Sequence, residues 1–360
     1  MYKIQKKNVP LHIKTKIVDT WLRDILQKSL KMASPSGSEE QMTMLFAQTV
    51  APYVDEVTYD ANGNCIAHKR GKGAKVMLMA HADEVGFMIT YVDDKGFLYF
   101  NQIGGIDTNI LPGMRVLIQG RQDIVTGIIG RKPIHLQDES ERGKNLNPED
   151  LWIDIAAKDK ADALSKVQIG SVATYESTPV MLSDMLILSK SLDDKIGIAV
   201  LMGLARNLQS ISTDSDIYLV ASVQEELGAR GAQGVSTAIL PEIGIAIDVT
   251  HATDYPTMSP IKDGDISLGK GVVIPVGPNM NKSINKMLTA TAELAGIPYQ
   301  VEAIAKPTGT DARVIQIAGN GIKTGLISIP CRYMHTPNEM VSLTDADNAI
   351  TLLTEFLQKL

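Results

Sequence analysis

The sequence has few cysteines and no long apolar run, and each shortage excludes a class of protein. Its 360 residues include two cysteines, Cys65 and Cys331, which are too few for a disulfide framework or a thiolate metal site. No apolar stretch reaches the roughly 18 residues of a membrane-spanning helix. No apolar segment follows the basic N-terminus, as it would in a secretory signal. We therefore expect a cytoplasmic protein with no membrane partner.

The chain also lacks a strong excess of charge of either sign. It carries 41 acidic and 35 basic residues, a net charge of −6, and its basic residues form only short clusters. Because nucleic-acid binding needs a basic patch, we expect no nucleic-acid partner. A hydrophobic content of 44% and a charged content of 21% are typical of a globular protein with a substantial core.

Helical and strand patterns alternate in two parts of the chain. Residues 18–57 predict two helices, and Ser38 with Gln41 predicts a capping box at the start of the second. After residue 178 the alternation resumes, and Thr344 is the expected N-cap of the last helix. We expect residues 1–84 plus 179–360 to form one α/β domain, a mixed and mostly parallel sheet flanked by helices.

The intervening residues have a different pattern. Segments such as ITYVDDKGFLYF, RVLIQG and IVTGIIG predict short strands separated by turn residues. A polar stretch at 135–151 is too long for a tight connection and predicts a loop with a helical turn or a mobile segment. We therefore expect an inserted β-rich domain over residues 85–178.

Several predicted strands of the α/β part run into side chains that bind metals. The carboxyl ends of parallel strands meet at one edge of a sheet, where ligands usually bind. Asp193 lies just before a predicted helix and would reach the same edge. The side chains that follow the strands are His81 with Asp83, Glu225 with Glu226, Asp248, and His335.

Two histidines and several carboxylates without a thiolate suit Zn²⁺, Co²⁺ or Mn²⁺. Two ions about 3.5–4 Å apart would need a bridging carboxylate. The residues allow one such arrangement, in which one ion has two ligands, the other has two, and one carboxylate joins them. The pairs are His81 with Asp248 and His335 with Glu226, and the bridge is Asp193.

Two acidic residues are left over beside these candidate ligands. Glu225 is placed to act as a general base that deprotonates a water molecule. Asp83 is placed to accept a hydrogen bond from the second ring nitrogen of His81. Each residue also has an ordinary explanation, because single polar residues after strands are often only solvated and Asp193 could cap a helix. Their conjunction favours a metal site, and His251 lies close enough to Asp248 to line it.

Long motifs surround these residues. They are AHADEVGFM (80–88), PIHL (133–136), DLWIDIAA (150–157), SLDDKIG (191–197), SVQEELGARGA (222–232), AIDVTHATD (246–254), GTDA (309–312) and ISIPCRYMHTPNE (327–339). With these motifs nearly the whole chain resembles the M42 metallo-aminopeptidases, the group of glutamyl and tetrahedral aminopeptidases. Lys195 stands where arginine is commoner in that family, and His251 is also less usual there.

The resemblance implies an enzyme that releases N-terminal amino acids from peptides with a free N-terminus. It implies two divalent metal ions per subunit, with Zn²⁺ or Co²⁺ expected first and Mn²⁺ also suitable. A water that bridges the ions would attack after Glu225 takes its proton. The resemblance gives the same roles to the residues already singled out: metal ligands at His81, Asp193, Glu226, Asp248 and His335, and an orienting role for Asp83.

The resemblance also implies that residues 85–178 are a PDZ-like or barrel domain that forms dimers, which in the family often assemble into tetrahedral dodecamers. Two other functions remain open. A glycoside hydrolase needs two carboxyl groups flanking one bond and has no use for His81 and His335. A metal-stabilised scaffold needs closed coordination and has no use for Glu225.

Overall fold

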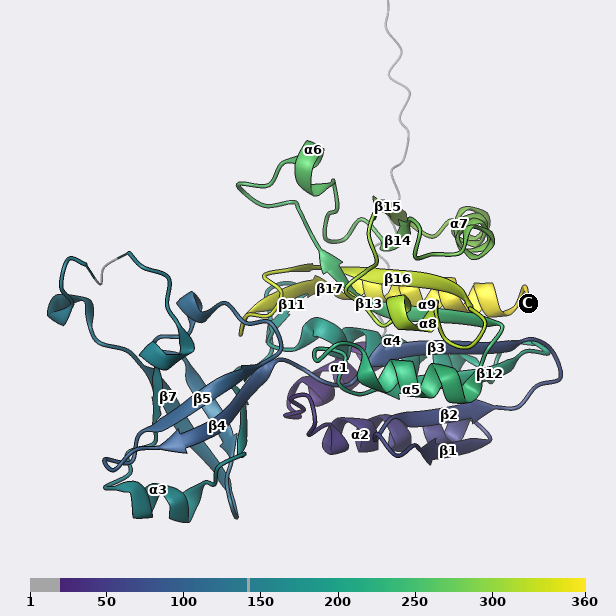
Figure 1. Cartoon of the computed structure of the whole chain (residues 1–360). Helices are drawn as coiled ribbons and strands as arrows, with labels where there is room; N and C mark the ends of the chain where they lie inside the picture. The colour runs from purple at the N-terminus through teal and green to yellow at the C-terminus, as the bar shows by residue number, and fades with distance from the viewer. Residues whose placement is uncertain (1–19, 141–142) are drawn as a thin grey trace, which may run out of the picture.

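The computed structural model describes residues 20–140 and 143–360. The basic N-terminal segment considered above lies outside the described residues, and so do residues 141 and 142 of the predicted 135–151 loop. The chain forms a helix-flanked sheet and a separate β-barrel (Figure 1). Within the described ranges, no helix is long and apolar enough to cross a bilayer.

The large sheet has the strand order β1-β2-β12-β3-β13-β16-β17-β11-β10, and β14 joins β16 to β15. The four central strands β12, β3, β13 and β16 are parallel, whereas the outer strands pair antiparallel. The prediction of a mixed sheet is confirmed, with parallel pairing confined to this centre and to β14–β15. The strands are β1 (Glu56–Tyr59), β2 (Cys65–Lys69), β3 (Lys75–His81), β10 (Val180–Met181), β11 (Leu186–Ser189), β12 (Asp216–Ser222), β13 (Ile243–His251), β14 (Val272–Val276), β15 (Tyr299–Ala303), β16 (Lys323–Arg332) and β17 (Glu339–Ser342).

Helices cover both faces of this sheet. On β3, Val76 and Leu78 face a core shared with α1, α2, α4, α7 and α9, while Met77 and Met79 face a second core with α5 and α8. A strand buried on both faces is what its unbroken apolar run predicts. The helices are α1 (Thr20–Leu30), α2 (Glu40–Val50), α3 (Lys160–Lys166), α4 (Leu192–Asn207), α5 (Arg230–Ile239), α6 (Pro260–Asp263), α7 (Lys282–Ala295), α8 (Ala312–Ile315) and α9 (Leu343–Leu357).

Two predicted helix starts are wrong. Glu39, not Ser38, is the N-cap residue of α2, and it makes no side-chain capping bond. The last helix begins at Leu343 with Ser342 as N-cap, two residues before Thr344. At α2 the Glu39 carboxylate does not cap the helix but accepts hydrogen bonds from the distant Gln224 N–H and the nearby Gly37 N–H. At α9 the helix begins directly after Ser342, the last residue of β17.

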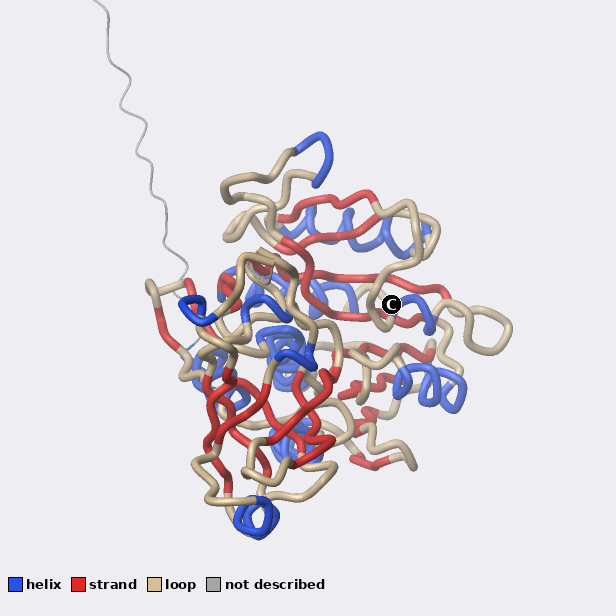
Figure 2. The backbone as a smooth tube through the Cα atoms, turned by 60° about the vertical axis from the view of Figure 1, so that its left-hand side comes forward, coloured by secondary structure: helices blue, strands red, loops and turns tan. Residues whose placement is uncertain are grey.

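The barrel is closed and antiparallel, in the order β4-β5-β8-β7-β6-β9. Figure 2 shows its strands crossing in front of the helix-flanked sheet. Three aromatic rings pack together among the aliphatic side chains of its core, with Phe87 at 5.2 Å from Phe100 and 5.4 Å from Tyr175 between centroids, so the predicted β-rich insertion forms a packed unit. The strands are β4 (Gly86–Val92), β5 (Leu98–Ile103), β6 (Arg115–Gln119), β7 (Ile124–Gly130), β8 (Trp152–Asp154) and β9 (Val172–Tyr175).

A buried ion cluster lies where the barrel leaves the sheet. The Glu84 carboxylate accepts hydrogen bonds from Lys195 Nζ (2.8 Å), from Lys190 Nζ and from the Ser34 N–H (2.9 Å). Burial alone would raise the pKa of Glu84, but the two ammonium groups lower it to about 2. Glu84 thereby joins the α1–α2 connection, the base of the barrel and the start of α4.

We expect Glu84→Gln to lower the free energy of unfolding by about 3–5 kcal/mol at pH 7, because it leaves two buried ammonium groups without a counter-charge. Urea denaturation measures this change, with the exposed Glu149→Gln as the matched control. Since the folded pKa of Glu84 lies below the ~4.3 of an unfolded glutamate, its contribution exists above that pH and is lost as pH falls towards 2. A variant as stable as the wild type would contradict this role.

Candidate metal centre

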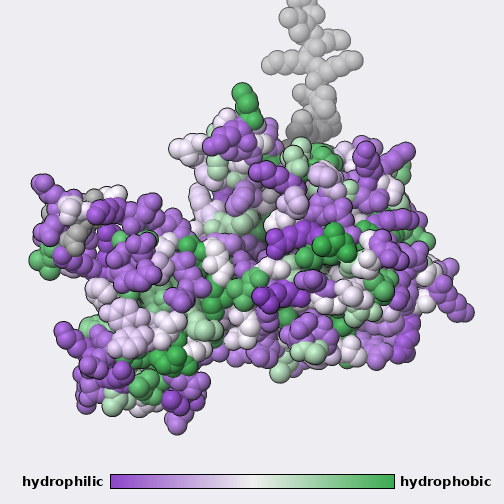
Figure 3. All heavy atoms as spheres, viewed as in Figure 1, coloured by the Kyte–Doolittle hydropathy of each residue, from purple (hydrophilic) through white to green (hydrophobic). Residues whose placement is uncertain are grey.

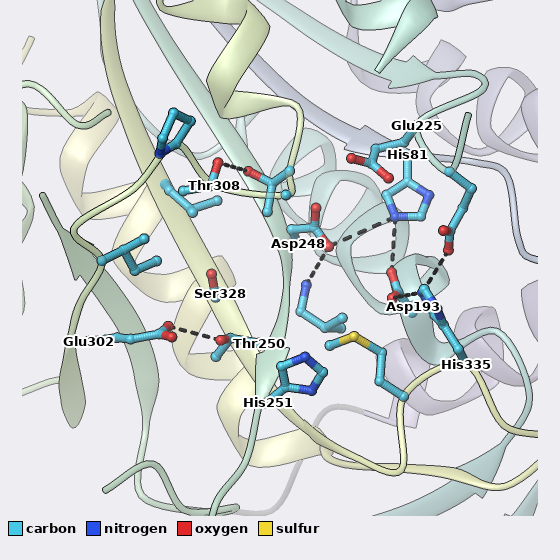
Figure 4. Close-up of a pocket in the computed structure, with 18 residues that line it drawn as sticks. His81, Asp193, Glu225, Asp248, Thr250, His251, Glu302, Thr308, Ser328 and His335 are labelled. Carbon is cyan, nitrogen blue, oxygen red and sulfur yellow. Dashed lines mark hydrogen bonds and ion pairs between the residues drawn. The ribbon is translucent and has the colours of Figure 1, made fainter. Parts of the chain in front are cut away.

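The centre of the site is the Asp193 carboxylate, which lies between two imidazoles. Its Oδ1 is 3.0 Å from His81 Nε2 and its Oδ2 is 3.3 Å from His335 Nε2 (Figure 4). Each imidazole faces a second carboxylate, with Glu226 Oε1 3.0 Å from His335 Nε2 and Asp248 Oδ1 3.8 Å from His81 Nε2. The five candidate ligands named from the sequence therefore lie side by side.

The topology of the sheet explains this meeting. His81 ends β3, Glu226 follows β12, and His335 follows β16, all at the carboxyl ends of central parallel strands. Asp248 differs from expectation, because β13 does not end there but continues to His251. Asp193 comes from the first turn of α4, where its backbone angles are not helical.

Asp83 holds the connection that follows β12. Its carboxylate accepts hydrogen bonds from the N–H groups of Glu225 (3.0 Å) and Glu226 (3.1 Å) and from Ser36 Oγ (2.6 Å). It also lies beside His81, whose Nδ1 is 3.2 Å from the Asp83 carbonyl oxygen and 3.4 Å from its Oδ1. One fully buried carboxylate thus fixes both an imidazole and the neighbouring pair of glutamates.

Glu225 is a buried acid with an unused oxygen. Its side chain is 8% exposed, and among the described residues its Oε1 has no hydrogen-bond partner. Burial raises the pKa of Glu225 to about 10, and the carboxylates of Asp248 and Asp311 add to the shift. An unsatisfied buried carboxyl oxygen costs free energy, so a binding or catalytic role explains it better than a structural one.

The donor set fits divalent cations. Two groups of donor atoms, each within 4.8 Å of one another, can hold an ion: His81 with Asp194 and Asp248, and His81 with Asp193 and Glu226. Burial raises the pKa of Asp248, Asp194 and Glu226, so the site has more carboxyl groups than it can ionise alone. Bound cations would let these groups ionise.

Asp194 was not expected as a ligand, and its hydrogen bonds argue against that role. Its Oδ2 accepts from the His81 N–H (3.3 Å) and its Oδ1 from the Gly197 N–H (3.0 Å). These bonds hold the end of β3 against the first turn of α4. Asp194 therefore aligns the two elements that carry His81 and Asp193.

Two supporting groups were missed from the sequence. The buried Glu339 carboxylate accepts from the His335 N–H (2.8 Å) and from the Asp193 N–H (3.0 Å), so one side chain positions two candidate ligands. The barrel supplies the second group, because the Gly105 carbonyl oxygen lies 2.6 Å from His335 Nδ1. Glu339 ends a quoted motif, but a carbonyl contact has no sequence signal.

The backbone near the site is strained. Of the described residues other than glycine with left-handed φ values, four are candidate ligands or lie within two residues of one, and their φ values are between 54° and 63°. Such conformations cost free energy and tend to persist at functional sites. They are Ser191, Gln224, Tyr333 and His335.

A cavity of about 350 Å³ opens beside the ligand cluster. The proposed ligands and Glu225 line one side of it, and His251 lines it as expected from the sequence. The far side is formed by β13, β15, β16 and the 304–310 segment (Figure 4). The site therefore has room for a substrate next to the clustered imidazoles and carboxylates.

A helix-flanked mixed sheet with such a cluster at its parallel strand ends defines an α/β enzyme able to bind metal ions. A family model described as M42 glutamyl aminopeptidase matches residues 63–352, and the chain belongs to this family. It is 36% identical to the lysyl aminopeptidase of Pyrococcus furiosus, over 94% of this chain and 97% of that protein. Membership supports peptide hydrolysis.

Solved structures agree with this assignment. The aminopeptidase APDkam598 of Desulfurococcus kamchatkensis superposes with a TM-score of 0.88 at 33% identity, over 95% of both chains. The TET1 peptidase of Pyrococcus horikoshii, which can assemble into a tetrahedron or a large octahedral shell, superposes with a TM-score of 0.84 at 29% identity. That match covers 94% of this chain and all of the other. The helix-flanked sheet and barrel are thus the fold of aminopeptidases.

We expect Asp193→Ala to bind fewer divalent ions than the wild type, by at least one per subunit, because the carboxylate contacts both imidazoles. Elemental analysis after loading with Zn²⁺ or Co²⁺ and gel filtration measures this. The exposed Asp123→Ala on the barrel is the matched control and should keep its full metal content. Equal metal content in both variants would rule out a shared ligand at Asp193.

Proposed function

We propose that the protein is a dinuclear metallo-aminopeptidase that releases N-terminal amino acids from peptides with a free N-terminus. The observation that carries the proposal is the Asp193 carboxylate between the imidazoles of His81 and His335. A carboxylate so placed suits a bridge between two ions. Family membership supplies the reaction class.

The five candidate ligands can be assigned to two ions. His81 and Asp248 would hold one, Glu226 and His335 the other, and Asp193 would bridge them. Zn²⁺ or Co²⁺ is the expected metal, and Mn²⁺ also suits imidazole and carboxylate donors. When bound, such ions supply Lewis-acid polarisation of the scissile carbonyl and lower the pKa of a coordinated water.

Glu225 is the proposed general base. It takes the proton of the attacking water and returns it to the leaving amine. Its raised pKa belongs to a site crowded with carboxyl groups, and nearby cations would favour the carboxylate form that a base requires. Asp83 positions the Glu225 backbone, and Glu339 positions Asp193 and His335.

The two alternatives explain the site less well. A glycoside hydrolase would leave both imidazoles without a role. A purely structural metal site would not keep the buried Oε1 of Glu225 without a partner, since an unsatisfied carboxyl oxygen lowers stability. Peptide hydrolysis gives a role to the imidazoles and to Glu225 together.

The barrel is the proposed dimerisation domain. We assign residues 85–178 to it and residues 1–84 plus 179–360 to the catalytic domain. Its strands expose apolar side chains at Met88, Tyr91, Ile124 and Ile128, and Figure 3 shows hydrophobic surface on the barrel. Burial of such surface drives association, and the Pyrococcus horikoshii peptidase can assemble into a tetrahedron. The proposed state of this protein is a dimer or a tetrahedral dodecamer built from dimers.

A cytoplasmic location is part of the proposal. Both cysteines, Cys65 and Cys331, are buried free thiols, which suits a reducing compartment.

The direct test is the release of N-terminal residues from short peptides with free and with acetylated N-termini. The metal-loaded protein should cleave only the free peptides, and a chelator should abolish the activity until metal is restored. Mass spectrometry of the products measures both effects. Cleavage of acetylated peptides, or cleavage that survives complete metal removal, would contradict the proposal.

We expect Glu225→Gln to lower kcat by about 10²–10⁴-fold, the usual contribution of a general base. Metal content by elemental analysis should stay at the wild-type level, because Glu225 is not one of the proposed ligands. Steady-state kinetics on one free peptide measures the loss. Unchanged kcat would exclude Glu225 as the base, and loss of metal would make it a ligand instead.

A further inference from the structure

The far side of the active-site cavity carries an acid that the proposed reaction does not use. Glu302 lies on β15, half-buried, and lines the cavity together with Thr250 and Ser328. In Figure 4 it lies across the cavity from His81, Asp193 and His335. A substrate held at the ligand cluster would have room to extend a side chain towards Glu302.

The Glu302 carboxylate is oriented but not neutralised. Thr250 Oγ1 donates a hydrogen bond to its Oε2 at 2.9 Å, and within the described residues no lysine or arginine forms an ion pair with it. Its other oxygen can therefore accept a bond from a bound group. Lys306 and Asp265 lie in an adjoining groove on the other side of Glu302, outside this cavity.

The charge around the cavity favours the binding of a positively charged ligand group over a negatively charged one. No lysine or arginine of the described chain lines it, and His251 is the only basic side chain at the end where Glu302 lies. A bound acidic side chain would meet uncompensated negative charge, whereas an ammonium or guanidinium group would gain a partner.

The cavity walls suit the stem of a long basic side chain. Ile304, Pro307 and Met334 are apolar, at least partly exposed, and line the same cavity. Lysine and arginine pack their methylene groups along apolar surface and place the charge at the tip. A cavity with the candidate ligands on one side, an acid on the far side and apolar residues in its wall matches an N-terminal lysine or arginine.

We propose that Glu302 is a specificity-determining residue that selects peptides with an N-terminal lysine or arginine. The inference rests on the proposed aminopeptidase function and adds its substrate class. Glu302 contacts the side chain of the first residue and takes no part in the bond cleavage.

The test compares two substrates that differ mainly in the charged tip, N-terminal lysine and N-terminal norleucine. For the wild type, kcat/KM should be higher for lysine. Glu302→Gln keeps the shape and should lower kcat/KM for lysine by about 10–100-fold, the value of a hydrogen bond to a charged group, mainly through KM. It should change the norleucine value by less than about threefold. Asp265→Asn, which removes a nearby charge outside the cavity, is the control and should keep the lysine preference.

A binding measurement separates this inference from the proposed reaction. Calorimetric titration of the metal-loaded protein with free L-lysine and L-norleucine should show tighter binding of lysine, lost in Glu302→Gln. Lysine-selective binding without peptide cleavage would support the pocket and contradict the aminopeptidase function. Cleavage with equal preference for the two substrates would overturn the pocket alone. Equal losses for both substrates in Glu302→Gln would place the carboxylate at the α-ammonium group and also overturn it.

Discussion

The site depends on one constraint, that Asp193 must stay ionised and aligned between two imidazoles in a buried cluster of acids. His81 and His335 lower the pKa of Asp193 despite its burial. The surrounding acids have the opposite problem, since burial raises the pKa of Asp248, Glu225 and Glu226. Such a cluster is costly without cations and favourable with them, which supports the proposed binding of metal ions.

The rest of the fold holds this cluster in place. The N-terminal part of α4 is buried between the sheet and neighbouring helices, so Asp193 has little freedom. Glu339 ties it to the loop that carries His335, and Glu84 ties α4 to the base of the barrel. These contacts hold the side chains of the cluster in a fixed arrangement, which is what catalysis by positioned charges requires.

The barrel also contributes a contact to the candidate site. Its Gly105 carbonyl lies within hydrogen-bond distance of His335 Nδ1, so the barrel helps to decide which nitrogen of His335 faces the cluster. A change in barrel position would therefore reach a proposed ligand through one contact. The proposed assembly through the barrel would therefore be physically connected to the candidate site at the sheet edge.

Much of this arrangement could be predicted from the sequence because it follows from strand ends. An apolar run buried on both faces marks β3 as a central strand, and parallel strands bring His81 and His335 to one edge. Local rules failed where distant contacts prevailed. The Glu39 carboxylate accepts a hydrogen bond from the Gln224 N–H and does not cap α2. Strand β13 continues past Asp248 because β16 pairs with it as far as His251.

The long-range contacts that support the candidate ligands could not be predicted. Glu339 ends a quoted motif, but the motif does not show that its carboxylate joins His335 to Asp193. The contact of the Gly105 carbonyl with His335 has no sequence signal. Glu302 faces the cavity only because β15 joins the sheet through β14. A single sequence shows which residue types are available, whereas the tertiary fold decides which of them meet.

We propose that the Asp193 carboxylate bridges two metal ions, one bound by His81 and the other by His335. Anomalous diffraction from crystals loaded with Zn²⁺ or Co²⁺, recorded at the absorption edge of the metal, tests it most directly. We predict two peaks, one on each side of the Asp193 carboxylate, one bound by His81 and Asp248 and the other by Glu226 and His335. A single peak, or two peaks that Asp193 does not contact, would contradict it.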